Sequence, residues 1–76
     1  MTPRRIEILV LAANGNTNAD IARQLWLSEE TVKTHMRKIH EVLGARDRSN
    51  AVALGIIRGF VRPDQIDLRP AKRHAA

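Results

Sequence analysis

Apolar residues recur every three or four positions through much of residues 6–57, which is the spacing of one buried face of an α-helix. The first run follows Thr2 and Pro3, which suit the N-cap and the first position of a helix. Gly15 comes after it, and glycine favours the left-handed conformation in which many helices end. A first helix is therefore predicted from Pro3 to just before Gly15. Its inner face would consist of Ile6, Leu9, Val10 and Ala13.

A short second helix is predicted because Thr17 and Asp20 have the spacing of a capping box, in which a hydroxyl and a carboxylate each accept a backbone N–H. Its inner face would consist of Ile21, Ala22 and Leu25. Trp26 follows in a tight turn, where we expect the indole to pack over the helix ends. Ser28 then suits the N-cap of a third helix.

This third helix is predicted from Glu29 to about Leu43, and Gly44 ends it. Its apolar stripe would consist of Val32, Met36, Ile39 and Leu43. Lys33 and Arg37 are four residues apart and share the opposite face with Thr34. Such side chains suit guanine O6 and N7, thymine methyl groups and phosphates, although a solvated amphipathic face would look the same.

A fourth helix is predicted over residues 50 to about 58, with Ser49 as its N-cap. Its apolar residues cover nearly the whole circumference: Ala51, Val52, Ala53, Leu54, Ile56 and Ile57. A helix that is apolar on all sides is normally buried on all sides, and three other short helices can cover only one flank. The remaining flank predicts a two-fold contact with a second copy, with Val52, Gly55 and Ile56 at the interface.

The predicted fold class is all-α, with four helices and a helix-turn-helix formed by the second and third. A chain of 76 residues has room for one small domain, which we place at residues 1–61. Beyond it stand two prolines and no periodicity, so residues 62–76 are expected to form a basic, flexible tail. Its Lys72, Arg73 and His74 suit a solvated tail better than a DNA contact.

The composition of the chain limits the classes of function that it can have. Thirteen Lys and Arg against eight Asp and Glu give a net charge of +5, which favours an anionic partner, with nucleic acid first. No cysteine and only three histidines argue against a metal site, and we expect no cofactor. Neither a nucleophile–base set nor a glycine-rich phosphate loop indicates an enzyme.

The longest apolar run is Ile8–Ala13, far below the ~20 residues of a membrane span, and no export signal is visible, so we expect a cytoplasmic protein.

Four segments carry a resemblance to a known family. They are Thr2-Pro3-Arg4, Asn18-Ala19-Asp20-Ile21-Ala22, Ser28 to His35 (Ser-Glu-Glu-Thr-Val-Lys-Thr-His) and Leu43 to Ala51 (Leu-Gly-Ala-Arg-Asp-Arg-Ser-Asn-Ala). In order and spacing they resemble the LuxR/GerE-type DNA-binding domain over roughly residues 1–61. The resemblance implies a bacterial four-helix domain whose third helix reads DNA and whose fourth helix forms the dimer contact.

By position, the resemblance also implies functions for individual residues. Base contacts would come from Lys33, Thr34 and Arg37, and phosphate contacts from around Thr31, Lys38 and Arg46. Arg48 matches a characteristic arginine of the family, which could contact phosphate or tie its loop to the body of the domain. The chain departs from the family at Asn16, where a hydrophobe is usual, and at Gly55, where alanine is common. Glycine there weakens a helix by ~1 kcal/mol unless close packing compensates.

The predicted function is a stand-alone transcriptional regulator that binds specific double-stranded DNA as a homodimer, without a receiver or ligand-binding domain of its own. RNA polymerase or another regulator is a possible further partner. Two alternatives remain. A relative of sigma factor region 4 would share the Thr-Val-Lys core but would lack the fourth helix after Arg48. A protein-interaction module would pair with a full-length regulator through the fourth helix and block it.

Overall fold

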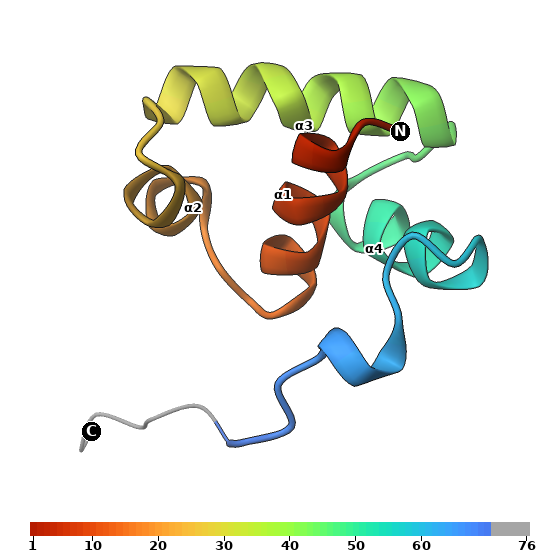
Figure 1. Cartoon of the computed structure of the whole chain (residues 1–76). Helices are drawn as coiled ribbons and strands as arrows, with labels where there is room; N and C mark the ends of the chain where they lie inside the picture. Colours follow the sequence, from red (N-terminus) through yellow and green to blue (C-terminus); the bar gives the residue numbers. More distant parts are fainter. Residues whose placement is uncertain (71–76) are drawn as a thin grey trace.

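The computed structural model describes residues 1–70, which form four α-helices and one short 3₁₀-helix. The α-helices are α1 (Pro3–Ala13), α2 (Asn18–Leu25), α3 (Glu29–Leu43) and α4 (Arg48–Ile57), and the 3₁₀-helix is η1 (Pro63–Gln65). In Figure 1, α1 lies in the middle and contacts the other three α-helices. Residues 1–70 contain no strand, so the predicted all-α class with four helices is confirmed. None of these helices is long and apolar enough to span a bilayer.

Side-chain caps define where the first three helices begin. The hydroxyls of Thr2, Thr17 and Ser28 each accept the backbone N–H three residues on, at 3.2, 3.1 and 3.1 Å. Asp20 completes the predicted capping box by accepting the N–H of Thr17 at 2.9 Å. This hydrogen bond from the Thr17 backbone holds the pKa of Asp20 below its usual value. The three predicted caps are confirmed.

The cap of α4 differs from the prediction. Asp47, not Ser49, is the N-cap, because its carboxylate accepts the N–H of Asn50 at 2.8 Å and the helix begins at Arg48. A carboxylate caps at least as well as a serine hydroxyl, and its charge suits the positive end of the helix dipole. The earlier start places Arg48 in the first turn of the helix.

One core unites the helices. It consists of Ile8, Leu9 and Ala12 of α1, Ile21 and Ala22 of α2, Val32, Met36, Ile39 and Leu43 of α3, Ala51 of α4, and Val61. The predicted stripe of α3 is confirmed residue for residue. Leu25, which was expected on the inner face of α2, is only half-buried.

Gly55 lies inside the domain and not on the outer flank where the dimer prediction placed it. A Cβ added to it would stand 2.6 Å from Leu9 Cδ2 and 3.4 Å from Val61 Cγ2. The missing side chain thus lets α4 approach α1 closely. Close packing within one chain accounts for the glycine, and its assignment to a dimer interface is wrong.

Trp26 does not pack over the helix ends, contrary to expectation. The residue is 94% exposed, and its backbone ends α2 in the left-handed conformation, with φ 58° and ψ 41°. The N–H of Leu27 donates to Ala22 O at 2.9 Å, the long hydrogen bond of a Schellman-type helix end. Leu27 packs against the core instead, and the left-handed turn leaves the indole in solvent.

Part of the expected flexible tail is held against α1. The Asn14 side chain donates to Gln65 O at 2.9 Å and accepts the N–H of Asp67 at 2.6 Å, while Ile66 packs against the core. Asn14 thus fixes the segment around η1 at the C-terminal end of α1, in blue in Figure 1. Lys72, Arg73 and His74, the basic residues predicted in the tail, lie outside the described residues.

Candidate nucleic-acid interface

Helix α3 is uncovered along one side. Figure 1 shows α1, α2 and α4 all on the other side of α3, which spans the top of the view. Its buried stripe anchors it to the core, and Lys33, Thr34 and Arg37 are exposed. The structure thus brings the three predicted base-contacting residues together on one accessible face, carried by a helix whose position the core fixes.

The charges on this face are only loosely engaged. Lys33 Nζ lies 4.0 Å from Glu30 Oε2, and Lys38 Nζ lies 3.6 Å from Glu41 Oε1. Exposed pairs of this kind contribute little, about 0–1 kcal/mol. Both lysines can therefore leave their glutamate partners and bind another anion at a small cost in free energy.

Thr31 and Thr34 use their hydroxyls within the helix. Thr34 Oγ1 donates to Glu30 O at 3.1 Å, which leaves an acceptor and a methyl group for an outside partner. Thr31 Oγ1 lies 2.8 Å from Ser28 Oγ, and either hydroxyl can donate the hydrogen bond between them. Both threonines are exposed, so a phosphate or a base can reach them.

Arg46 and Arg48 flank the start of α4 but differ in position. Arg46 is exposed, and its backbone N–H donates to Asn50 Oδ1 at 3.0 Å. Arg48 is half-buried, and its guanidinium donates to Asn18 Oδ1 at 2.8 Å and to Asn16 O at 2.6 Å. Of the two explanations for Arg48, the structure supports the tie between its loop and the body of the domain.

The outer flank of α4 carries a second exposed surface, and it is apolar. The exposed fractions are 41% for Ile56 and 79% for Ile57, while Val52 is half-buried against the core. Ile57 was not among the predicted interface residues. A helical wheel that placed Ala51 and Gly55 inward would have found it, because residues 53 and 57 then face away from the domain.

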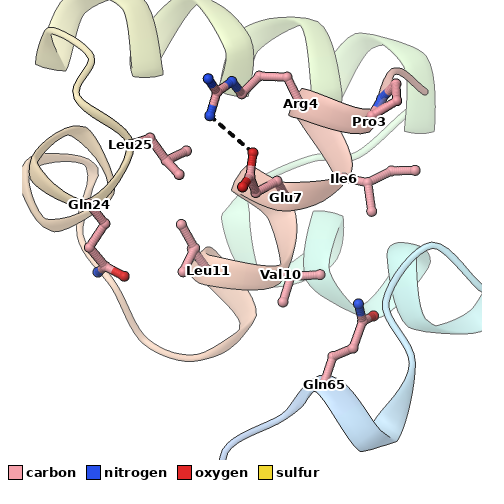
Figure 2. A pocket seen from close by; sticks show the side chains of 9 residues that line it. All are labelled: Pro3, Arg4, Ile6, Glu7, Val10, Leu11, Gln24, Leu25 and Gln65. Atoms are coloured by element: carbon pink, nitrogen blue, oxygen red, sulfur yellow. Dashed lines mark hydrogen bonds and ion pairs between the residues drawn. The ribbon is translucent and has the colours of Figure 1, made fainter.

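An open hollow of about 910 Å³ lies on the outer side of α1, between α2 and η1 (Figure 2). It is lined by Pro3, Arg4, Ile6, Glu7, Val10 and Leu11 of α1, Gln24 and Leu25 of α2, and Gln65. Its one ion pair joins Arg4 and Glu7 at 3.0 Å. This lining combines no nucleophile with a base, and residues 1–70 hold no cluster of groups suited to a metal ion.

Comparison with known proteins identifies close relatives. Residues 1–54 match the family described as bacterial regulatory proteins, luxR family. The uncharacterized transcriptional regulatory protein YxjL of Bacillus subtilis is 44% identical over 61 residues, which are 80% of this chain and 28% of that protein. The transcriptional regulatory protein DegU of Brevibacillus brevis is 37% identical over 62 residues, 82% of this chain and 26% of that protein. The chain thus spans about a quarter of the length of these relatives. No solved structure matches it significantly.

Proposed function

The chain belongs to the luxR family of bacterial regulatory proteins, a family of helix-turn-helix DNA-binding regulators and not of enzymes, and we propose that it regulates transcription by placing α3 in the major groove of specific DNA sites. The uncovered side of α3 (Figure 1), on which Lys33, Thr34 and Arg37 are exposed, carries the proposal. A helix about 10–12 Å wide fits a groove about 12 Å wide. The cytoplasm, where bacterial DNA lies, is the proposed place of action.

We assign the contacts by position on α3 and in the loop that follows it. Lys33 and Arg37 offer donors to base edges, and Thr34 offers its methyl group and an acceptor. Phosphate contacts are assigned to three exposed residues around this face: Thr31, Lys38 and Arg46. Arg48 is left out of this set, because its guanidinium already donates to Asn16 and Asn18.

The functional unit is proposed to be a homodimer that pairs through α4. Exposed isoleucines at positions 56 and 57 support it, since a contiguous apolar surface on a small domain indicates an interaction site. A two-fold axis through this flank would present two α3 helices to successive turns of the major groove. The same flank would also serve the alternative, a module that pairs with a full-length regulator and blocks it.

Selection of binding sites from random duplex DNA, followed by titration of variants, tests the proposed function. We expect Lys33→Ala and Arg37→Ala each to weaken binding to the selected site by about 1–3 kcal/mol, with little effect on random DNA. Arg46→Ala should weaken binding to all sequences alike and reduce the slope of log K against log salt by about 1. Arg62→Ala is the matched control, because Arg62 is exposed and pairs with Asp64 beside η1.

The outcomes separate the two candidates. If no sequence is enriched by the purified chain, the interaction module replaces the DNA-binding function. Equal losses on selected and random DNA for Lys33→Ala, Arg37→Ala and Arg46→Ala would contradict base contacts from α3. An Arg62→Ala variant that loses as much as these would contradict the placement of the whole interface.

A further inference from the structure

Arg48 joins two parts of the domain that carry different proposed tasks. It is the first residue of α4, the helix of the proposed dimer contact. Its guanidinium reaches Asn18 Oδ1, on the first residue of α2, and Asn16 O, in the loop before α2. One side chain thus links the dimer helix to the first helix of the helix-turn-helix.

Asn16 extends this link to both ends of the neighbouring helices. Its Nδ2 donates to Leu11 O in α1 at 2.9 Å, and its Oδ1 accepts from Gln24 Nε2 near the end of α2 at 2.8 Å. Its carbonyl accepts from Arg48. Hydrogen bonds from α1, α2 and α4 therefore converge on one loop residue.

The hydrogen bonds of Arg48 are suited to fixing the orientation of its side chain and not to neutralising its charge. The guanidinium is a planar fork with fixed donor directions, so its two acceptors, both in residues 16–18, hold it in one orientation. Both acceptors are neutral amide oxygens, which means that Arg48 gains no carboxylate partner from the arrangement. A lysine carries the same charge but presents no such fork.

Small changes of helix orientation matter for a dimer on DNA. A tilt of roughly 10° over the 21 Å shortest extent of the molecule displaces its far end by about 3.6 Å, close to the ~3.4 Å rise of one base pair. The relative orientation of α4 and α2 therefore decides which spacing of two half-sites both α3 helices can reach.

We propose that Arg48 is a positioning residue that sets the half-site spacing of the dimer by fixing α2, and α3 with it, relative to α4. The inference rests on the proposed function, since it concerns two DNA half-sites bound by two copies. It assigns to Arg48 a role in spacing specificity that needs no contact between its guanidinium and DNA.

The test measures binding to probes that carry two selected half-sites whose spacing varies in single base-pair steps. Arg48→Met removes the hydrogen bonds and keeps an aliphatic chain, and Arg48→Lys keeps the charge. For both variants we expect the affinity ratio between the best and the next spacing to fall by about fivefold or more. Asn14→Ala is the matched control, because it removes asparagine hydrogen bonds that hold the segment around η1 and leaves Arg48 and its two acceptors unaltered. It should keep the wild-type ratio.

Each result is decisive. An unchanged ratio in Arg48→Met overturns the inference, and so does an equal fall in Asn14→Ala. A uniform loss on all probes that Arg48→Lys restores would show a phosphate contact instead, because a lysine can replace an arginine there. If Arg48→Met does not fold by circular dichroism, Asn18→Ala, which removes one acceptor, should lower the ratio in the same direction. Wild-type chain that fails to bind any two-site probe cooperatively overturns the proposed dimer, whereas cooperative wild type with an unaltered Arg48→Met profile overturns the positioning role alone.

Discussion

Helices α3 and α4 both lie at the surface, but they divide their residues between inside and outside in opposite ways. Helix α3 buries four large apolar side chains and exposes lysines, an arginine, threonines and glutamates. Helix α4 buries Ala51 and Gly55, two of the smallest residues, and exposes Ile56 and Ile57. The fully buried residues are thus large on α3 and small on α4, and the most exposed large apolar residue of the two helices, Ile57, lies on α4.

The contrast indicates two kinds of partner. On α3, the buried stripe fixes the helix, so its polar outer face is free to bind a polar, charged surface such as DNA. On α4, small inward residues permit close approach to α1, while burial of the outward isoleucines would require a partner surface that is itself apolar. Substitutions on the inward and outward sides of α4 test whether these two sides have the different roles described here.

The largest effect is expected inside α4. Gly55→Val should destabilise the fold by about 1–3 kcal/mol, because a Cβ at this position would lie 2.6 Å from Leu9 Cδ2 and a branched side chain has no room to move away. Urea unfolding followed by circular dichroism measures the change.

Ala53→Val is the matched control for Gly55→Val. It adds a branched side chain to the same helix on its exposed side, so its effect should stay within about 0.5 kcal/mol. Equal losses for the two variants would mean that α4 does not pack on α1 through Gly55, and the contrast with α3 would fail.

On the outward side of α4, the expected effect is on assembly and not on folding. Ile57→Glu should leave the domain folded and reduce cooperativity on a two-half-site probe by about 1–3 kcal/mol, since a charge would replace the most exposed isoleucine of the flank. Ile56→Glu should act in the same direction. Titration of one-site and two-site probes separates cooperativity from intrinsic affinity.

Val52→Glu provides the contrast to the outer substitutions. Val52 is half-buried against the core, so a glutamate there should lower the melting temperature. Should Ile57→Glu and Ile56→Glu bind the two-site probe with wild-type cooperativity, the outer flank of α4 is not the dimer contact.

The two helices also differ in how well the sequence predicts them. Ser28, Gly44 and the stripe between them define α3 through interactions within a few residues, and local pattern is enough to recognise such interactions. The inward side of α4 depends instead on Leu9, which is distant in sequence, and on Val61, which lies beyond the end of the helix. An all-round apolar helix offers no local clue to the choice. The Gly55 assignment failed for this reason.

The site residues also differ in how well the sequence predicts them. The exposure of Lys33 and Arg37 was predictable because the two residues stand one helical turn apart, on the side of α3 opposite the apolar stripe. The role of Arg48 stayed open in the sequence, since its acceptors Asn16 and Asn18 belong to another segment. Trp26 was misplaced because a left-handed backbone at a bulky residue is rare and local pattern gives no sign of it.

At Trp26, as at Ile57 of α4, a large apolar side chain faces solvent. Trp26→Gly should stabilise the fold by about 0.5–1 kcal/mol. The left-handed conformation costs a residue with a Cβ roughly 1–2 kcal/mol, and the greater freedom of glycine in the unfolded chain offsets about 0.5–1 kcal/mol of that relief. Thermal melts followed by circular dichroism measure the gain.

Trp26→Ala separates backbone strain from side-chain packing in this prediction. It removes the same exposed indole but keeps a Cβ in the left-handed region, so its melting temperature should stay near that of the wild type. A stabilised Trp26→Gly beside an unchanged Trp26→Ala would show that Trp26 contributes nothing to the fold, and its exposure would then be a feature of the turn alone. If both variants lose stability, the indole packs against the domain in solution, and the apolar surface of α4 has no counterpart at the start of α3.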